Sequence, residues 1–398
     1  MARLLPEKYK EDLYGCLQCG YCRDACPVYE QIGWESATPR GKSFYLRGLT
    51  KKGLFDRMLG RSVDALIRRR AVADNKLAVR LYQCTSCGAC EEVCHSNIKF
   101  VPLWEDVRHW INERGLGPME AHKQIYSRVK QLRNPYNEPT ENRAKWLPPD
   151  VKLSDKPEVV FFAGCTESYR MQPLAQASVR ILSKAGVPFT VLGADEWCCC
   201  SPLLRTGQRD IVEEFIRHNA EAVLKTGAKT LVTACAGCYN TINKDHRKIL
   251  GSLPFELYHI SQYIEKLIKE GKLQLTKPVN KTVVYHDPCH LGRHAGVFDA
   301  PRNVLRAIPG LKLVEMKRIR KESRCCGAGG GVKSAFNDLA EDIAVARIKE
   351  AKESGAELIA TSCPFCIVNL NAGATRLGST LGPTPKTVDV LELVMQAI

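Results

Sequence analysis

The sequence predicts an α+β protein of several domains, in which an all-helical N-terminal domain precedes two copies of an α/β domain with a parallel sheet. Three observations predict this fold class. All nineteen cysteines fall into four clusters, the C-terminal part repeats itself after about 125 residues, and each copy alternates short apolar strands with helical segments. A chain of 398 residues has room for two to four such domains.

Residues 1–133 form the predicted helical domain, which contains two motifs of the form C-x2-C-x2-C-x3-C. The motif cysteines are Cys16, Cys19, Cys22, Cys26 and Cys84, Cys87, Cys90, Cys94. This spacing wraps three thiolates around one cubane [4Fe–4S] cluster, while the fourth reaches another cluster. Between and after the motifs we expect helices, for example over 101–114, where the apolar residues fall at helical spacing.

Residues 134–157 contain five prolines and no apolar period, which predicts an extended connector. The two α/β domains are then expected at 158–277 and 278–398. The segment VVFFAGC, ending at Cys165, matches VVYHDPC, ending at Cys289, and TGAKTLVTACAGC recurs as SGAELIATSCPFC. An internal duplication accounts for these matches most simply.

Each copy has the same predicted elements. The expected strands are 159–162, 189–192 and 230–233 in the first copy and 283–285, 312–315 and 358–361 in the second. The expected helices are 174–184 and 211–225, then 303–308 and 338–353. Such alternation predicts a parallel sheet covered by helices, and ligands bind beyond the carboxyl ends of its strands.

The cysteines of each copy follow those strand ends as a lone cysteine, an adjacent pair and a CxxC motif. The two sets are Cys165, Cys198, Cys199, Cys235, Cys238 and Cys289, Cys325, Cys326, Cys363, Cys366. Five thiolates exceed the four that a cubane needs, which indicates a larger cluster or a spare ligand. An adjacent pair favours bridging two metals of one assembly.

Disulfides, zinc and structural packing account for the cysteines less well than clusters do. Disulfides suit small secreted domains, whereas the cysteine count here is odd and the opening MARLLPEKYKEDLYG lacks the apolar core of a signal peptide. Zinc closes on two CxxC pairs, which the N-terminal motifs do not offer. Buried structural cysteines would not repeat one spacing twice.

The formal charge of +15 counts every cysteine as neutral, and each ligated cubane would add about −2. The remaining basic charge is concentrated in 40–70 and interleaved with apolar residues. Such a basic stretch is compatible both with a solvated face and with docking on a membrane protein or anionic lipid. No recognised nucleic-acid-binding module accompanies it, and no run of about 18 apolar residues predicts a membrane span.

The spacing C-x32-CC-x35-CxxC, followed by C-x35-CCG-x36-CxxC, resembles the duplicated cysteine-rich CCG domain of heterodisulfide reductases. Residues 1–133 resemble their helical ferredoxin module. The whole chain therefore resembles the fused D subunit of that family, with FFAGCTESY, GADEWCCCSPLLRTGQ, HDPCHLGRH and CCGAGGG as supporting stretches.

The resemblance implies an oxidoreductase acting on a sulfur group, in EC class 1.8. Each five-cysteine set would be catalytic and would hold a noncubane [4Fe–4S] cluster. The mixed disulfide of coenzyme M and coenzyme B, or an analogue, would be reduced between the two noncubane clusters. Two cubanes held by the N-terminal motifs would supply the electrons.

A second family with this architecture comprises the iron–sulfur subunits of glycolate, lactate and glycerol-3-phosphate dehydrogenases, which relay electrons from a flavoprotein partner to a quinone. In those proteins the CxxC motifs are commonly degraded, whereas here both are intact, which favours disulfide reduction. The family resemblance also implies a cytoplasmic protein, associated with the membrane through a b-type cytochrome subunit. We expect no nucleic-acid partner.

An extra cysteine, three histidines and a glycine run lie close to the cysteine sets in the sequence. Cys200 stands where the family has glycine, and we expect a thiol that does not ligate. His286, His290 and His294 surround Cys289, and hydrogen bonding to the cluster or packing is favoured over proton donation. The glycines of GAGGG, which follow Cys326, are expected to let the backbone approach a cluster.

Overall fold

The protein is described by a computed structural model that covers residues 9–50, 58, 76–381 and 383–398. The chain divides into two compact units. Unit 1 consists of Met1–Gln124, Pro202–Arg209 and Gly327–Ile343, and unit 2 consists of Ile125–Ser201, Asp210–Cys326 and Ala344–Ile398. Each unit is a separate body with its own core.

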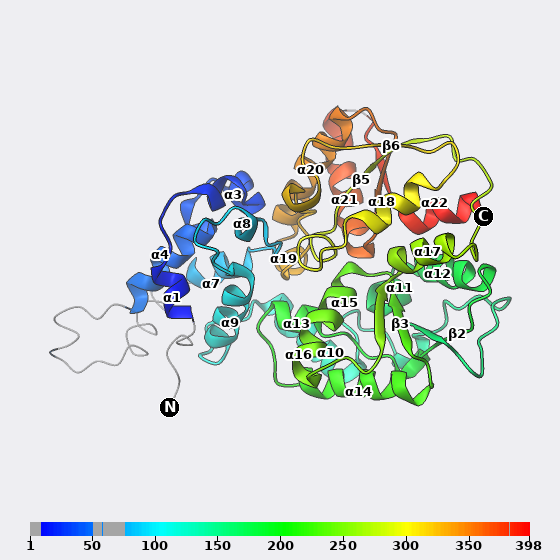
Figure 1. Ribbon diagram of the computed structural model, residues 1–398. Helices are drawn as coiled ribbons and strands as arrows, with labels where there is room; N and C mark the ends of the chain where they lie inside the picture. The colour runs from blue at the N-terminus through cyan, green and yellow to red at the C-terminus, as the bar shows by residue number, and fades with distance from the viewer. Residues whose placement is uncertain (1–8, 51–57, 59–75, 382) are drawn as a thin grey trace. The chain divides into compact units, whose positions relative to one another are not determined.

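Unit 1 is helical throughout its described residues (Figure 1). Its helices are α1 (Lys10–Tyr14), α2 (Tyr21–Asp24), α3 (Pro27–Ile32), α4 (Pro39–Thr50), α7 (Lys76–Tyr82), α8 (Ala89–Glu92), α9 (Phe100–Asn112) and α19 (Val332–Ala335). The predicted helix over 101–114 is α9, which buries Leu103, Trp104 and Val107 in the core of the unit. This apolar face at helical spacing explains why α9 forms the centre of the unit.

Two segments of unit 1 come from the two repeated copies: Pro202–Arg209 begins three residues after Cys199, and Gly327–Ile343 begins directly after Cys326. The guanidinium group of Arg108 on α9 is fully buried and donates hydrogen bonds to the carbonyl oxygens of Cys84 (2.7 Å), Arg205 (2.5 Å) and Gly330 (3.1 Å). Gly330 has φ +65°, and a Cβ there would lie 2.2 Å from the carbonyl oxygen of Cys84. Only glycine permits this approach.

Unit 2 contains two four-stranded parallel sheets. The first has the order β2-β1-β3-β4 and the second the order β6-β5-β7-β8. The strands are β1 (Val159–Phe161), β2 (Phe189–Val191), β3 (Thr230–Thr233), β4 (Glu256–His259), β5 (Thr282–Tyr285), β6 (Lys312–Val314), β7 (Leu358–Thr361) and β8 (Lys386–Asp389). The identical order in both sheets is the structural counterpart of the sequence repeat.

The helices of unit 2 cover the sheets and join the two copies. They are α10 (Glu120–Leu132, which begins in unit 1), α11 (Gly164–Tyr169), α12 (Gln172–Lys184), α13 (Ser201–Arg205, which continues into unit 1), α14 (Val212–Lys225), α15 (Ala236–Thr241), α16 (Arg247–Leu250), α17 (Ile260–Lys269), α18 (Asp299–Arg306), α20 (Asn337–Glu353, which begins in unit 1), α21 (Pro364–Leu381) and α22 (Val390–Ala397). Helices α12 and α17 of the first copy meet α18 and α22 of the second in one apolar core (Figure 1). That core contains Val179, Ile264, Leu305 and Leu391, all nearly or completely buried.

The predicted fold class is confirmed. All six predicted strands are present, and each ends within one residue of its predicted end. The fourth strand of each copy, β4 and β8, was not predicted. No helix among the described residues is long and apolar enough to cross a membrane.

Candidate metal centres

The two N-terminal motifs exchange their last cysteines in the folded chain. One cavity is lined by Cys16, Cys19, Cys22 and Cys94, together with Arg40. A second cavity is lined by Cys26, Cys84, Cys87 and Cys90. Each cavity therefore offers three thiols from one motif and one from the other, the arrangement that the spacing predicts for two cubanes.

Basic side chains of the predicted 40–70 stretch lie beside these cavities. Burial raises the pKa of Cys26 to about 12, and the nearby ammonium group of Lys42, itself buried, acts in the opposite direction. Arg40 is paired with Glu35 (2.7 Å), and Arg47 donates to the carbonyl oxygen of Cys16 (3.4 Å). The described basic residues thus provide positive charge next to sites for anionic clusters. The remainder of the stretch, residues 51–57 and 59–70, lies outside the described residues.

The first five-cysteine set lies beyond the carboxyl ends of β1, β2 and β3. Cys165 follows β1 in the first turn of α11, the pair Cys198–Cys199 follows β2, and Cys235 is the N-cap of α15. Thiol–thiol hydrogen bonds run from Cys165 to Cys198, on to Cys199, Cys238 and Cys235. All five thiols are therefore close enough to share one metal assembly.

A buried ion pair supports Cys165. Nη2 of Arg143 donates to Oε1 of Glu196 (2.6 Å) and to Sγ of Cys165 (3.4 Å). Glu196 in turn accepts the backbone N–H groups of Ala163 (3.0 Å) and Gly164 (2.8 Å). Hydrogen bonds from Cys198 and the positive charge of Arg143 lower the pKa of Cys165 against the effect of burial. Arg143 belongs to the predicted connector 134–157, and its role was not apparent from the sequence.

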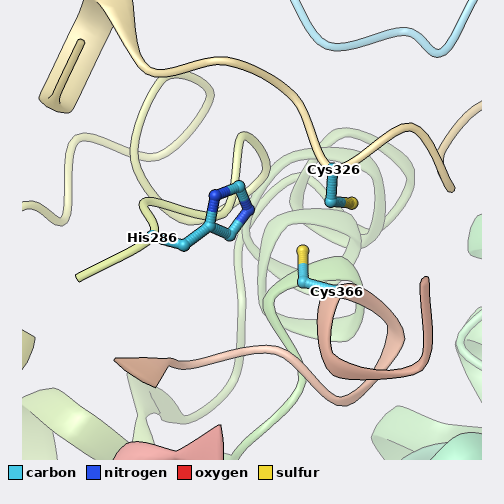
Figure 2. Close-up of side chains that lie close together, drawn as sticks. All are labelled: His286, Cys326 and Cys366. Atoms are coloured by element: carbon cyan, nitrogen blue, oxygen red, sulfur yellow. The ribbon is translucent and has the colours of Figure 1, made fainter. Parts of the chain in front are cut away.

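The second set is built in the same way after β5, β6 and β7. Hydrogen bonds join Cys325 to Cys326, Cys326 to Cys366 and Cys366 to Cys363, and Cys289 is buried after β5 as Cys165 is after β1. Hydrogen bonds from Cys325, Cys366 and His286 lower the pKa of Cys326 well below its usual value. Ring nitrogen and sulfur atoms of His286, Cys326 and Cys366 lie within 4.8 Å of one another (Figure 2).

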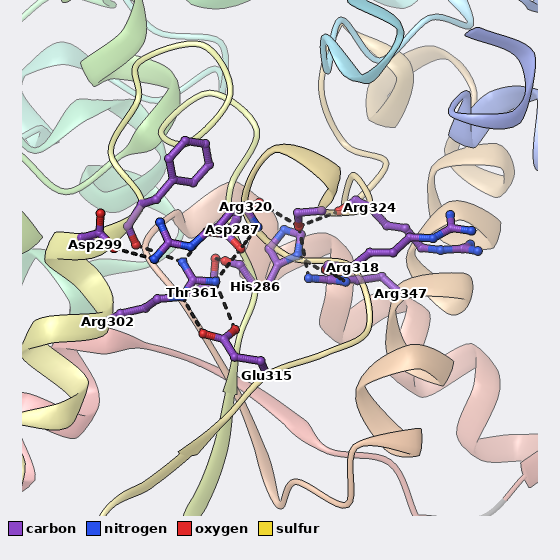
Figure 3. A network of polar contacts seen from close by, with 12 residues as sticks. His286, Asp287, Asp299, Arg302, Glu315, Arg318, Arg320, Arg324, Arg347 and Thr361 are labelled. Atoms are coloured by element: carbon purple, nitrogen blue, oxygen red, sulfur yellow. Dashed lines mark hydrogen bonds and ion pairs between the residues drawn. The ribbon is translucent and has the colours of Figure 1, made fainter. Parts of the chain in front are cut away.

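A network of ion pairs holds the backbone around His286 (Figure 3). Arg302 is fully buried and binds Asp287 with two hydrogen bonds (2.6 and 2.9 Å), and it also binds Glu315 (2.7 Å). The backbone N–H of Arg320 donates to Asp287 as well (2.8 Å). Asp287 follows His286 directly, so this network fixes the segment that leads to Cys289.

The two cysteine sets are neighbours within unit 2. A side-chain hydrogen bond joins Cys235 of the first set to Cys363 of the second. A Cβ added at Gly237, between Cys235 and Cys238, would lie 3.9 Å from Nδ1 of His290. Residues of both copies thus meet at one place, and the two five-cysteine sets are adjacent.

Glu167 is a further buried group near both sets that the sequence did not single out. Neither of its carboxyl oxygens has a hydrogen-bond partner among the described residues. Burial raises the pKa of Glu167 well above its usual value, and the carboxylates of Asp389 and Glu196 act in the same direction. The carboxyl group of Glu167 therefore binds a proton more readily than an exposed glutamate does.

Several details of the site fit iron–sulfur clusters. A Cβ at Gly164 would lie 2.9 Å from Sγ of Cys238, so only glycine leaves room for the sulfur there. Nε2 of His286 is buried and has no nitrogen or oxygen partner in the described chain. Thiols in contact with one another, an unpartnered ring N–H group facing sulfur and nearby cations match an anionic, sulfur-rich group.

Comparisons with known proteins agree with this geometry. Residues 159–243 and 283–371 match the family described as Cysteine-rich domain, and residues 12–98 match the 4Fe-4S dicluster domain. The chain is 42% identical, over 97% of its length and 94% of the relative's, to the D subunit of dihydromethanophenazine:CoB–CoM heterodisulfide reductase from Methanosarcina barkeri. It is 33% identical to the B subunit of fumarate reductase (CoM/CoB) from Methanothermobacter marburgensis, over 99% of this chain and 75% of that one.

A more distant relative is EtfAB:quinone oxidoreductase of Syntrophomonas wolfei, which is 29% identical over 97% of this chain and 58% of its own length. A crystal structure of a hypothetical protein from Helicobacter pylori superimposes with a TM-score of 0.52 at 10% identity, over 99% of this chain and 76% of that one, which shows a shared fold. The relatives and the two domain matches identify an iron–sulfur oxidoreductase with 4Fe-4S clusters. The chain belongs to the family of heterodisulfide reductase D subunits.

Proposed function

We propose that this protein reduces a disulfide, the mixed disulfide of coenzyme M and coenzyme B or an analogue, between its two five-cysteine sets. The contact between Cys235 of the first set and Cys363 of the second carries the proposal. Because the two sulfurs of a disulfide are only about 2 Å apart, two sites that act on both sulfurs must be neighbours. The relative from Methanosarcina barkeri, which this chain matches over nearly its whole length, is named for that substrate.

Each five-cysteine set would hold a noncubane [4Fe–4S] cluster, and the two N-terminal sets would each hold a cubane. When bound, the noncubane clusters supply one electron each, so that the disulfide and two protons give two thiols. The protein's own residues position the ligands: Arg143 and Glu196 hold Cys165, while Arg302 and Asp287 hold the segment before Cys289. Gly330, which lies four residues after Cys326 in the sequence, lets the backbone approach the carbonyl oxygen of the cubane ligand Cys84 within unit 1.

The isolated, fully loaded chain tests the proposal directly. With a reduced viologen dye as electron donor, it should reduce the mixed disulfide without any flavoprotein, because all the required sites lie on this chain. Thiol release measured against dye oxidation should give two thiols for every two electrons. A protein that carries all its iron and leaves every tested disulfide intact would contradict the proposal.

The alternative function is electron relay from a flavoprotein to a quinone, and the EtfAB:quinone oxidoreductase relative favours it. That relative is much longer than this chain, which spans 58% of it. A relay protein would show no disulfide reduction by itself. It would reduce a quinone analogue only after a flavoprotein partner and that partner's substrate were added.

We also propose that the protein is cytoplasmic and associates with the membrane through a b-type cytochrome subunit. The relatives from Methanosarcina barkeri and Methanothermobacter marburgensis are both named as subunits of larger enzymes. Charge-driven association weakens as salt rises, since the screening length falls to about 3 Å at 1 M. Washing membranes with 1 M salt should therefore release the protein, whereas a need for detergent would indicate apolar contacts instead.

A further inference from the structure

His286 lies at the carboxyl end of β5, with its ring directed at the sulfur atoms of the second set (Figure 2). Its backbone is fixed on both sides: its N–H donates to the carbonyl oxygen of Ala360 (2.8 Å), and its carbonyl oxygen accepts from Oγ1 of Thr361 (3.1 Å). The side chain is completely buried. The imidazole therefore has a fixed position beside Cys326 and Cys366.

Arg347 on α20 determines which ring nitrogen carries the hydrogen. Nε of Arg347 donates to Nδ1 of His286 (3.2 Å). Glu350 (2.9 Å), Oγ of Ser323 (3.1 Å) and the carbonyl oxygen of Arg318 (2.9 Å) hold the same guanidinium group. Figure 3 labels Arg347 with Arg318 and His286. An arginine N–H can only donate, so Nδ1 accepts, and a ring that accepts at Nδ1 is neutral with its single hydrogen on Nε2.

The hydrogen on Nε2 determines whether His286 can bind iron or donate a hydrogen bond to sulfur. Iron binding at Nε2 would require loss of that hydrogen and leave an imidazolate ring. Donation to sulfur requires no such loss, and Nε2 has no hydrogen-bond partner among the described residues, so its N–H group can donate to the sulfur of a bound cluster. The arrangement is thus that of an N–H···S donor to Cys326.

We infer that His286 is a positioning residue that donates an Nε2–H···S hydrogen bond to Cys326, and that Arg347 fixes the tautomer that makes this possible. The inference rests on the proposed function, because it requires a cluster at the second set. Hydrogen bonds to cluster sulfur stabilise the extra electron and raise the reduction potential. His286 therefore makes the second noncubane cluster easier to reduce.

Among the described residues, the first copy has no histidine at the position equivalent to His286. Phe162 occupies the aligned position there, and it is also buried. His246, the histidine near Cys199, contacts the carbonyl oxygen of Cys199 (3.2 Å), just as Asn369 contacts that of Cys326 (2.6 Å). In the first set, the Arg143 side chain donates to Cys165, and the backbone of Ser201 hydrogen-bonds Cys199. The two clusters are thus tuned by different residues, and the effect of His286 is confined to the second.

Three variants of the full-length, iron-loaded chain test the inference. His286→Phe introduces the residue of the first copy and removes the donor. His286→Gln keeps an N–H group near the position of Nε2. Arg347→Lys keeps a cation beside Glu350 but loses the planar donor that fixes Nδ1. Phe162→Leu in the first copy is the matched control.

The readout is a redox titration followed by EPR, in which the signal of the second cluster is identified by its loss in Cys326→Ala. We expect His286→Phe to make reduction of this cluster at least tenfold less favourable, a negative midpoint shift of about 59 mV for one electron. His286→Gln should recover most of this shift, Arg347→Lys should cause part of it, and Phe162→Leu should leave this signal unchanged. An exchangeable proton coupling in pulsed EPR should disappear in His286→Phe.

Failure of the proposed function and failure of the inference about His286 give different results. Wild-type protein with only about eight irons would remove the noncubane clusters, and the proposed function would fail together with this inference. About sixteen irons with an unchanged midpoint in His286→Phe would overturn the inference alone. A strong ¹⁴N coupling, typical of a directly bound ring nitrogen, would show that His286 is a ligand and would also overturn it.

Discussion

At the residue scale, Cys200 is a buried cysteine next to the first five-cysteine set, and we expect that it does not bind the metal assembly. Its φ is +66°, in the left-handed region that favours glycine, and the second copy has Gly327 with φ +93° at the aligned position. The Cys200 side chain is completely buried, with Sγ 3.6 Å from the carbonyl oxygen of Cys198. The backbone therefore explains why the family has glycine here.

We predict that Cys200→Gly retains all its iron and its activity. Relief of the left-handed strain, worth about 1 kcal/mol, is offset by the greater flexibility of glycine in the unfolded chain, so stability should change by less than about 1 kcal/mol. Iron analysis and denaturant unfolding measure both quantities. A loss of about four irons would identify Cys200 as a ligand.

Arg143 forms a buried ion pair with Glu196 beside Cys165. Replacing it by leucine leaves Glu196 charged and buried next to Cys165, and breaking a buried ion pair in this way costs about 3–5 kcal/mol. We expect Arg143→Leu to lose the iron of the first five-cysteine set while the N-terminal sets keep theirs. Arg143→Lys, which keeps the charge, should retain more iron. Full iron in Arg143→Leu would show that the pair does not support Cys165.

At the scale of elements, the sequence predicts the three strands of each copy that precede a cysteine group and misses the fourth, β4 or β8. β1 and β3 are apolar runs that lead directly into Cys165 and Cys235, so the motif marks their ends. β4 (ELYH) and β8 (KTVD) have no cysteine and no continuous apolar run. They form because each pairs with an existing strand edge, which is a tertiary effect that local sequence does not encode.

The same limit applies to the candidate site. Spacing predicts which cysteines act together, because the three thiols of one cubane lie within seven residues of the sequence. It does not predict that Arg143 reaches Cys165 or that Arg347 reaches His286 across 61 residues. Such partners come from other elements, and only the packing of those elements brings them together.

His122, which contacts Gly331 in the segment Gly327–Ile343, should make the folding stability of this segment depend on pH. His122 is fully buried, its Nε2 lies 2.9 Å from the carbonyl oxygen of Gly331, and its Nδ1 has no partner among the described residues. Burial lowers the pKa of His122 to about 4. Protonation would place an unsatisfied N–H in the core, so the folded state binds this proton less readily than the unfolded state does.

The free energy of unfolding should therefore decrease as the pH falls. With an unfolded pKa near 6.5, the stabilisation is fully present above pH 6.5 and is lost as the pH falls towards 4. At pH 5 the loss should be about 2 kcal/mol. Hydrogen-exchange protection of α19, corrected for intrinsic rates, should fall as the pH is lowered from 7 to 5. The decrease should be smaller in His122→Gln. Equal pH dependence in both proteins would exclude His122 as the cause.

At the scale of the whole molecule, the duplication supplies two sites that are similar in architecture but different in their surroundings. Both copies place their cysteines beyond the carboxyl ends of parallel strands in the same order. Arg143 and Glu196 support the first set, whereas His286, Arg347 and the Asp287–Arg302 pair support the second. The duplication thus gives two neighbouring five-cysteine sets, and each set is surrounded by different charged and hydrogen-bonding residues.

This organisation predicts how the molecule responds when either set is disabled. The intact chain should contain about sixteen irons, and Cys165→Ala and Cys326→Ala should each contain about twelve. Each single variant should lose disulfide reduction completely while the cubane EPR signals remain, because each site acts on one sulfur of the substrate. Anaerobic iron and sulfide analysis, EPR and viologen-dependent thiol release measure these outcomes. If either variant keeps half of the wild-type turnover, one set alone is sufficient, and the pairing of Cys235 with Cys363 has no part in the reaction.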